Sequence, residues 1–98
     1  MDTHVATTTS AIVATEAQLE ELRAGIAELS PALSAFARRF VRTEEEVDDL
    51  VQETMLRGLR AIHRFTPGTT LKSWLFTIMR NTFCTRYKVA QRERIGLP

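Results

Sequence analysis

The sequence predicts an all-α fold: a compact bundle of three principal helices, preceded by a shorter helix and a flexible tail. Apolar residues recur three and four positions apart from residue 19 to residue 82, which is the period of a helix. Helix-start signals precede several of these segments. No stretch of convincing length alternates between apolar and polar residues, as a half-buried strand would.

The first part of the chain divides into a tail and two helices. Residues 1–15 are rich in Thr and Ala and lack an apolar period, so we expect a flexible tail. A short helix over about residues 16–29 follows, with apolar positions at Leu19, Leu22, Ile26 and Leu29. Ser30-Pro31 is typical of an N-cap followed by proline at the first helical position. That helix would end near Arg42 and bury Leu33, Phe36, Ala37 and Phe40.

The longest acidic segment begins with a capping signal. Thr43 is a good N-cap, and Glu46 three residues later completes a capping box. The helix would run from residue 44 to His63. Gly58 inside it costs about 1 kcal/mol relative to alanine, but would allow a neighbouring helix to pack closely. The predicted apolar stripe comprises Val47, Leu50, Val51, Thr54, Met55, Gly58, Leu59 and Ile62.

A turn and a final helix complete the predicted fold. Pro67-Gly68 is a turn signal, and Thr69 or Thr70 would cap a helix that continues to about residue 92. Its core stripe comprises Leu71, Trp74, Leu75, Ile78, Met79 and Thr82. A second stripe comprises Phe76, Arg80, Phe83 and Tyr87. We expect residues 16–95 to form the single folded domain of the 98-residue chain.

The net charge of +1 conceals a strong separation of charge along the chain. Residues 44–53 carry acidic side chains and no basic ones, whereas the charged residues within 72–94 are all basic except Glu93. This asymmetry favours two electrostatically different partners. The alternative is a pair of solvated helix faces with no partner.

Several functional classes are disfavoured. No apolar run approaches the ~18 residues of a membrane span, and the N-terminus lacks the pattern of a secretory signal. The single cysteine excludes an internal disulfide and fits a reducing compartment, so we expect a cytoplasmic protein without membrane contact. Two histidines and one cysteine form no metal-ligand cluster, and no phosphate loop or catalytic triad pattern is present. We therefore expect no metal, no cofactor, no catalytic residue and no enzymatic activity.

Over residues 31–92 the chain resembles region 2 of the extracytoplasmic-function sigma factors of bacterial RNA polymerase. The resemblance rests on the segments 48–54, 65–69, 71–76 and 80–82, in that order and spacing. The Pro67-Gly68-Thr69 turn together with Asn81-Thr82-Phe83 is most similar to the general-stress subgroup of alphaproteobacteria. The family's second domain, a helix-turn-helix that reads the minus-35 element, has no counterpart here, so we expect an isolated domain or a fragment.

The acidic-amide face of the 44–63 helix is the first candidate surface. Its side chains stand three or four residues apart and so share one side of the helix. Carboxylates accept hydrogen bonds and an amide both donates and accepts, which suits a partner helix bearing arginines and amides. The resemblance implies that this partner is the coiled coil of the polymerase beta-prime subunit, bound by Asp48, Asp49, Gln52, Glu53 and Leu56. The alternative is a solvated face with intrachain pairs such as Glu53 to Arg57.

The turn and the final helix form the second candidate surface. Lys and Arg side chains neutralise phosphates, aromatic rings stack on unpaired bases, and an amide such as Asn81 can read a base edge. The resemblance implies that the loop before Trp74 captures a flipped base of the minus-10 element on the non-template single strand. The predicted DNA-binding residues are Phe65, Thr66, Gly68, Thr69, Thr70, Lys72, Phe76, Arg80, Asn81, Arg86 and Lys88.

Other interpretations of the same residues remain open. Trp74 is expected to lie largely in the core, whereas the place of Phe76 is undecided. Asn81 could be a surface amide without a role, and the turn could be an ordinary helix connection. A helical adaptor that binds only proteins is the alternative function, and a duplex-binding helix-turn-helix protein is a weaker one. The resemblance also implies an anti-sigma factor that covers the same surfaces.

Overall fold

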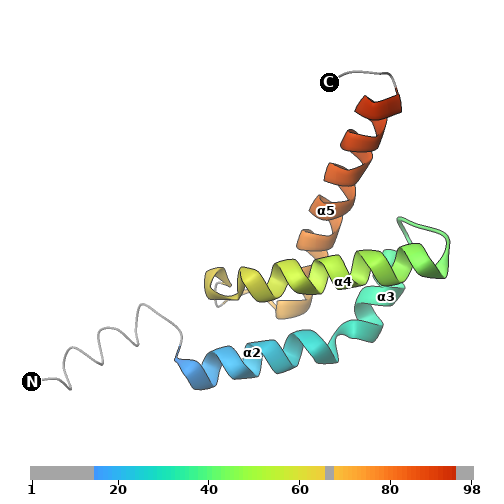
Figure 1. The fold of residues 1–98 in the computed structure, drawn as a ribbon. Helices are drawn as coiled ribbons and strands as arrows, with labels where there is room; N and C mark the ends of the chain where they lie inside the picture. Colours follow the sequence, from blue (N-terminus) through green and yellow to red (C-terminus); the bar gives the residue numbers. More distant parts are fainter. Residues whose placement is uncertain (1–14, 66–67, 95–98) are drawn as a thin grey trace, which may run out of the picture.

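A computed structural model describes residues 15–65 and 68–94, and every regular element in those ranges is helical. The elements are α2 (Glu16–Glu28), α3 (Ser30–Ala37), α4 (Glu44–Arg60), the 3-10 turn η1 (Ile62–Arg64) and α5 (Leu71–Arg94) (Figure 1). The predicted all-α class is confirmed. The predicted tail lies outside the described residues, apart from Thr15, which caps α2.

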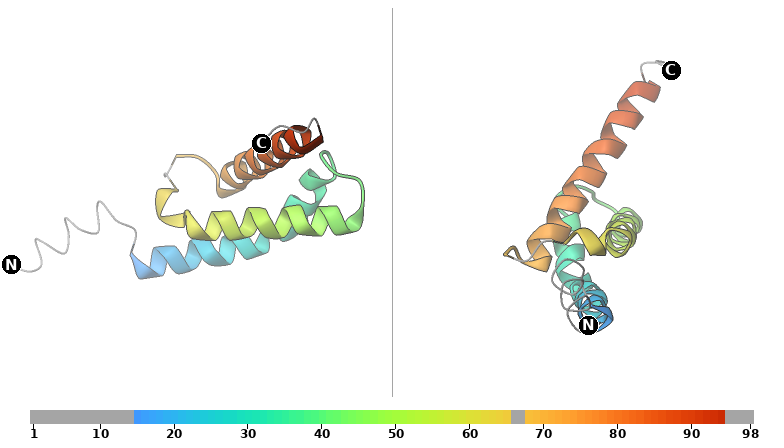
Figure 2. Two further views of the ribbon diagram at one scale, coloured as in Figure 1. Left: turned by 45° about the horizontal axis from the view of Figure 1, so that its top comes forward. Right: turned by 90° about the vertical axis from the view of Figure 1, so that its left-hand side faces the viewer.

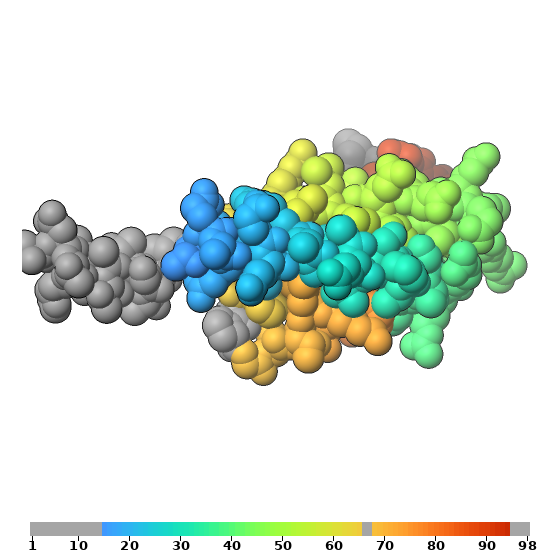
Figure 3. All heavy atoms as spheres, turned by 90° about the horizontal axis from the view of Figure 1, so that it is seen from below, coloured from blue at the N-terminus to red at the C-terminus, as the bar shows by residue number. Residues whose placement is uncertain are grey.

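Two helices run side by side and a third crosses them. In Figures 1 and 2, α2 lies along α4, while α5 crosses α4 steeply and its C-terminal half projects beyond the other helices. Figure 3 shows α2 lying between α4 and the start of α5, and α2 contacts both of them. The crossing of α4 and α5 therefore brings the acidic and the basic segments of the sequence together.

The junction between α2 and α3 differs from the prediction. Ser30 was expected to cap the second helix, but it is already the first helical residue, and Leu29 alone separates the two helices. The Leu29 N–H donates to the carbonyls of Gly25 and Ile26, so the chain passes from one helix to the next without a side-chain cap. The end near Arg42 was also wrong. α3 ends at Ala37, and turn bonds such as Phe40 N–H to the Ala37 carbonyl follow.

The capping box predicted for α4 is confirmed. The Glu46 N–H donates to Thr43 Oγ1 at 3.1 Å, and the Thr43 N–H donates to Glu46 Oε1 at 3.2 Å.

The predicted end of this helix at His63 was wrong, because α4 stops at Arg60 and the chain tightens into η1. This tightening places Ile62 in the core. The cap at Thr70 is also confirmed, since its Oγ1 accepts from the Ser73 N–H at 3.0 Å.

A single apolar core lies among the four helices. Its buried members are Ile26, Leu33, Ala37, Val47, Leu50, Val51, Ile62, Leu75 and Met79. Thr54 and Thr82 are also buried, and their hydroxyls donate to the carbonyls of Leu50 and Ile78 at 2.8 Å. Leu59 was predicted to lie in the core stripe, but this residue is 38% exposed. It follows the buried Gly58 by one residue, which turns it about 100° away from the core.

The tightest helix contact is at Gly58. A Cβ atom placed there would lie 2.7 Å from Leu75 Cδ2 and 3.6 Å from Ile26 Cδ1. Both neighbours are fully buried, so neither can turn toward solvent. The close packing suggested by a glycine inside this helix is therefore present.

We expect Gly58→Ala to destabilise the domain. Alanine would gain about 1 kcal/mol in helix propensity, but overpacking a filled core costs about 1–3 kcal/mol. A net loss of roughly 1 kcal/mol would lower the Tm by about 4–8 °C. Urea denaturation followed by circular dichroism measures it. The loss should shrink in a Leu75→Val background, which frees space at the contact, whereas a stabilised Gly58→Ala single variant would contradict the tight packing.

We expect Thr43→Ala to cost about 1 kcal/mol at neutral pH, because it removes an N-cap. The Thr43 hydroxyl bond, followed by its N–H bond, lowers the pKa of Glu46 below the ordinary 4.5. The folded pKa is depressed, so the contribution of Glu46 is present above pH 4.5 and is lost as the pH falls through the folded value. The variant should therefore lose less stability than wild type on acidification below pH 4.5. Thr43→Ser, which keeps the capping hydroxyl, is the matched control and should keep the acid slope of the wild type.

Candidate functional site

The predicted polymerase face of α4 is split into two stripes. Asp48, Gln52 and Leu56 are exposed on the outer side, and Leu56 is 43% exposed. Asp48 and Gln52 form no hydrogen bond or ion pair with the described part of the chain. Asp49 and Glu53 lie on the flank beside α5, because each follows its exposed neighbour by one residue, or about 100° of helix rotation.

A chain of ion pairs runs along this flank. Arg57 Nε donates to Glu53 Oε2 at 2.8 Å, as the alternative interpretation of the sequence had anticipated. Arg86 of α5 lies with Nη1 2.9 Å from Asp49 Oδ2 and Nη2 3.7 Å from Glu53 Oε1. The Arg57 hydrogen bond is the main cause that holds the pKa of Glu53 below its ordinary value, and the charges of Arg57, Arg86 and Arg60 add to it. Glu53 is therefore held between two arginines.

Arg86 was predicted to bind DNA, and in the structure its guanidinium lies against the acidic face. The sequence offered no signal for this contact, since residues 49 and 86 lie far apart in the chain. The contact arises only from the crossing of α4 and α5 (Figure 1). Arg86 also borders a hollow of about 320 Å³ whose lining includes Val41, Leu50, Phe83 and Tyr87.

The predicted base-capturing loop is described in part, since Thr66 and Pro67 lie outside the described residues. Gly68 adopts φ 108°, which L side chains rarely adopt, and a Cβ there would meet no atom within 4 Å. Glycine is therefore needed for the backbone conformation of the turn and not for space. Phe65 is half-buried and packs edge-to-face on Trp74, with centroids 5.4 Å apart. Thr69 is exposed, whereas Thr70 is committed to the cap.

Along α5 most of the basic residues are exposed, whereas most of the aromatic residues are half-buried. Phe76 is half-buried and stacked on Phe36 with centroids 4.0 Å apart, so one of its faces is covered. The Lys72 ammonium lies 5.6 Å from the centre of the same ring. Arg80, Asn81 and Lys88 are exposed, and their side chains form no hydrogen bond or ion pair within the described ranges. Trp74 packs against the core, as predicted.

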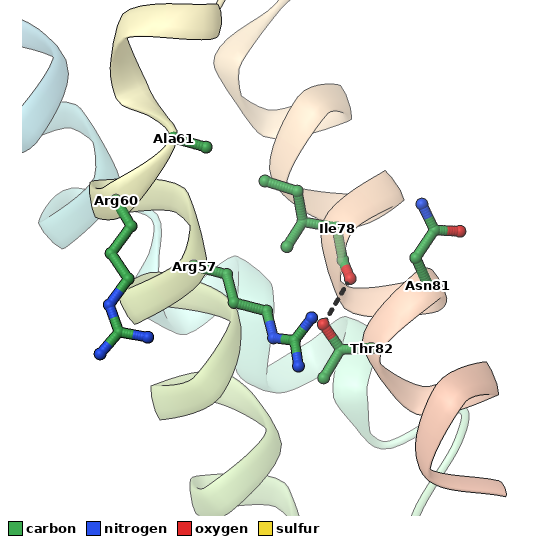
Figure 4. A pocket seen from close by; sticks show the side chains of 6 residues that line it. All are labelled: Arg57, Arg60, Ala61, Ile78, Asn81 and Thr82. Atoms are coloured by element: carbon green, nitrogen blue, oxygen red, sulfur yellow. Dashed lines mark hydrogen bonds between the residues drawn. The ribbon is translucent and has the colours of Figure 1, made fainter. Parts of the chain in front are cut away.

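A second hollow between α4 and α5 adds residues that the sequence did not single out. It measures about 300 Å³ and is lined by Arg57, Arg60, Ala61, Ile78, Asn81 and Thr82 (Figure 4). Ile78 and Thr82 point toward α4, and Asn81 lies at the outer rim. The Asn81 amide points away from the two arginines (Figure 4), and Arg57 is already bonded to Glu53, so these side chains border one hollow without converging on a single ligand position. Arg57 and Arg60 of α4 line the same hollow as Asn81 of α5 only because the two helices pack against each other.

Membrane-spanning helices and metal-ligand clusters are both absent from residues 15–65 and 68–94. No helix there is long and apolar enough to cross a membrane. No group of three or more His, Cys, Asp or Glu side chains there could hold a metal ion.

Residues 26–93 match the family described as Sigma-70 region 2. The chain belongs to this family. The ECF RNA polymerase sigma factor EcfG of Rhodopseudomonas palustris (strain TIE-1) is 46% identical over 74 residues, which are 76% of this chain and 41% of that protein. The RNA polymerase sigma factor CarQ of Myxococcus xanthus is 38% identical over 52 residues, 53% of this chain and 30% of CarQ. No solved structure gave a significant match.

These relatives place the region 2 domain among homologues of ECF sigma factors. The RNA polymerase sigma factor CnrH of Cupriavidus metallidurans is also 37% identical over 57 residues, 58% of this chain and 30% of CnrH. The chain thus spans less than half of the length of each of these relatives.

We expect Arg57→Gln to raise the pKa of Glu53 toward its ordinary value. The substitution removes the hydrogen bond and the nearest positive charge that favour the carboxylate. Arg86→Gln should raise that pKa by less, because Arg86 lies 3.7 Å from Glu53 and acts through charge alone. Carbon-detected NMR titration of the Glu53 carboxyl group measures both. A larger effect from Arg86 would show that the ion-pair chain is arranged differently in solution.

Proposed function

We propose that residues 16–95 form the part of an ECF sigma factor that docks on core RNA polymerase and melts the promoter minus-10 element. The observation that supports it most strongly is the pair of unlike surfaces in a sigma-70 region 2 chain. One surface is the carboxylate and amide face of α4. The other consists of the exposed cations and the amide along α5, together with the turn that precedes it.

The polymerase-binding surface consists of Asp48, Asp49, Gln52, Glu53 and Leu56. The outward Asp48 and Gln52 offer an acceptor and an amide without internal partners, and Leu56 adds exposed apolar area beside them. A helix bearing arginines and amides complements this combination. Its proposed source is the coiled coil of the polymerase beta-prime subunit.

The DNA-binding surface consists of the turn and the exposed side of α5. Phe65, Thr66, Gly68, Thr69 and Thr70 would line a pocket for a flipped base. Lys72, Arg80, Arg86 and Lys88 would neutralise phosphates of the non-template strand. Asn81 would read a base edge, and Phe76 would offer the part of its ring that Phe36 and Lys72 leave exposed. Arg57 and Arg60 extend this surface beside Asn81. Binding energy for the unpaired strand would then drive melting without ATP.

The identity to EcfG supports assignment to the alphaproteobacterial general-stress subgroup. We further propose a cytoplasmic protein without catalytic activity or cofactor, regulated by an anti-sigma factor that covers these surfaces. The basic helix would also suit an acidic protein partner, so the tests below separate DNA recognition from protein binding alone.

We expect this chain to bind the isolated beta-prime coiled coil in a calorimetric titration, and the double variant Asp49→Ala, Gln52→Ala to lose that binding. The variant removes the outward amide of Gln52 and the exposed carboxylate of Asp49. The Asp49–Arg86 ion pair that is lost is exposed and contributes little to stability, so the fold should be unaffected. Glu20→Ala, on α2, is the matched surface control. A folded wild-type chain that fails to bind would contradict the proposed docking role.

We expect the chain to prefer a single-stranded minus-10 oligonucleotide to the same duplex, with an affinity that falls as salt rises. Asn81→Ala should change the preferred base and cost about 1–3 kcal/mol for the favoured sequence. Arg80→Ala should weaken all sequences alike and reduce the salt slope by about one. Fluorescence anisotropy over a panel of single-base changes measures both. Equal, sequence-independent losses from the two variants would defeat the specificity assignment.

A further inference from the structure

The guanidinium of Arg86 occupies part of the surface proposed for polymerase docking. It lies 2.9 Å from Asp49 and 3.7 Å from Glu53, and both carboxylates belong to the proposed docking set. Glu53 is also bonded by Arg57 at 2.8 Å. A basic side chain arriving from a partner would therefore meet carboxylates that already have cations beside them.

The ion pair between Arg86 and Asp49 can separate readily when another cation competes for the Asp49 carboxylate. The side chain of Asp49 is 70% exposed and that of Arg86 is 40% exposed, so water can solvate both charges when they separate. Exposed ion pairs contribute little net free energy, since solvent and side-chain entropy offset the attraction. An external cation aided by further contacts can displace Arg86 from such a pair.

We propose that Arg86 is an internal competitor for the docking face, exchanged for a basic side chain of the partner when the domain docks. The proposal rests on the docking function above. Two adjacent groups fit this arrangement: Asp48 and Gln52 form no bond within the described chain and can make the first contacts. The partner must then supply a cation at the position of the Arg86 guanidinium, which makes Arg86 a determinant of partner specificity.

The exchange also predicts a link between the two surfaces. Once displaced, Arg86 is an unpaired cation on the helix proposed to bind DNA, where it can contact a phosphate. Docking would then strengthen strand binding, and by thermodynamic reciprocity the strand would strengthen docking by the same factor. Arg86 would then have two states. In the free domain it pairs with Asp49 and Glu53, and in the docked domain it contacts DNA, as the sequence predicted.

The test compares Arg86→Gln with Arg92→Gln in the full chain. Both variants lose one positive charge from α5, but Arg92 is exposed and forms no ion pair with described residues. Titration with the isolated beta-prime coiled coil at physiological salt should show roughly two- to fivefold tighter binding for Arg86→Gln, the span expected for an exposed pair, and near wild-type binding for Arg92→Gln. The gain should shrink in an Asp49→Asn background, where Arg86 keeps only its 3.7 Å contact with Glu53. Saturating coiled coil should raise the affinity of the wild type for minus-10 single strand more than that of Arg86→Gln.

The outcomes separate the two proposals. Equal affinity of Arg86→Gln and Arg92→Gln, with wild-type binding intact, would overturn the competition alone. Weaker docking by a folded Arg86→Gln would also overturn it, because Arg86 would then position Asp49 for the partner. Absence of docking by the wild type would overturn the docking function and this inference with it. Thermal unfolding of each variant establishes that the compared chains are folded.

Discussion

The close contact of α4 and α5 at Gly58 is the constraint on which the other features depend. Leu75 lies where a larger side chain at position 58 would have to be, so the two helices cross at short distance. That crossing fixes which residues of α5 meet the flank of α4. Ile78 and Thr82 face Arg57 and Ala61 across one hollow, and Arg86 reaches Asp49 and Glu53 farther along.

The electrostatics of the α4 face follow from its rotation relative to this crossing. Asp48 and Gln52 point to solvent, whereas Asp49 and Glu53, one position later, turn toward the cations of α5 and the next turn of α4. The sequence suggests one continuous acidic face. In the structure, one half of that face has no ion pair within the described residues, whereas the carboxylates of the other half are paired with arginines. On the proposed docking function, a partner would meet the unpaired half without competition and would exchange cations at the other.

The two halves of α5 differ in their packing. Its first half is anchored by Leu75 and Met79 in the core, and Phe76 is stacked on Phe36, so this half is fixed against the bundle. Its second half projects beyond the bundle and is exposed from Tyr87 onward (Figure 2). A rigid anchored segment followed by a solvent-facing basic one is a suitable support for a flexible single strand, because positioning and phosphate attraction come from different turns.

By itself the sequence determined the all-α class, the Thr43–Glu46 cap, a cap at Thr69 or Thr70 and most core positions, because helix period and capping are local properties. Local signals did not determine where α3 and α4 end or that Leu59 is exposed, since those depend on how each turn meets its neighbours. Tertiary structure alone decided the partners of Arg86 and the joining of Arg57 and Arg60 to Asn81. The reason is physical: a long cationic side chain pairs with whichever acceptor the packing brings within reach, and only the helix crossing specifies that acceptor.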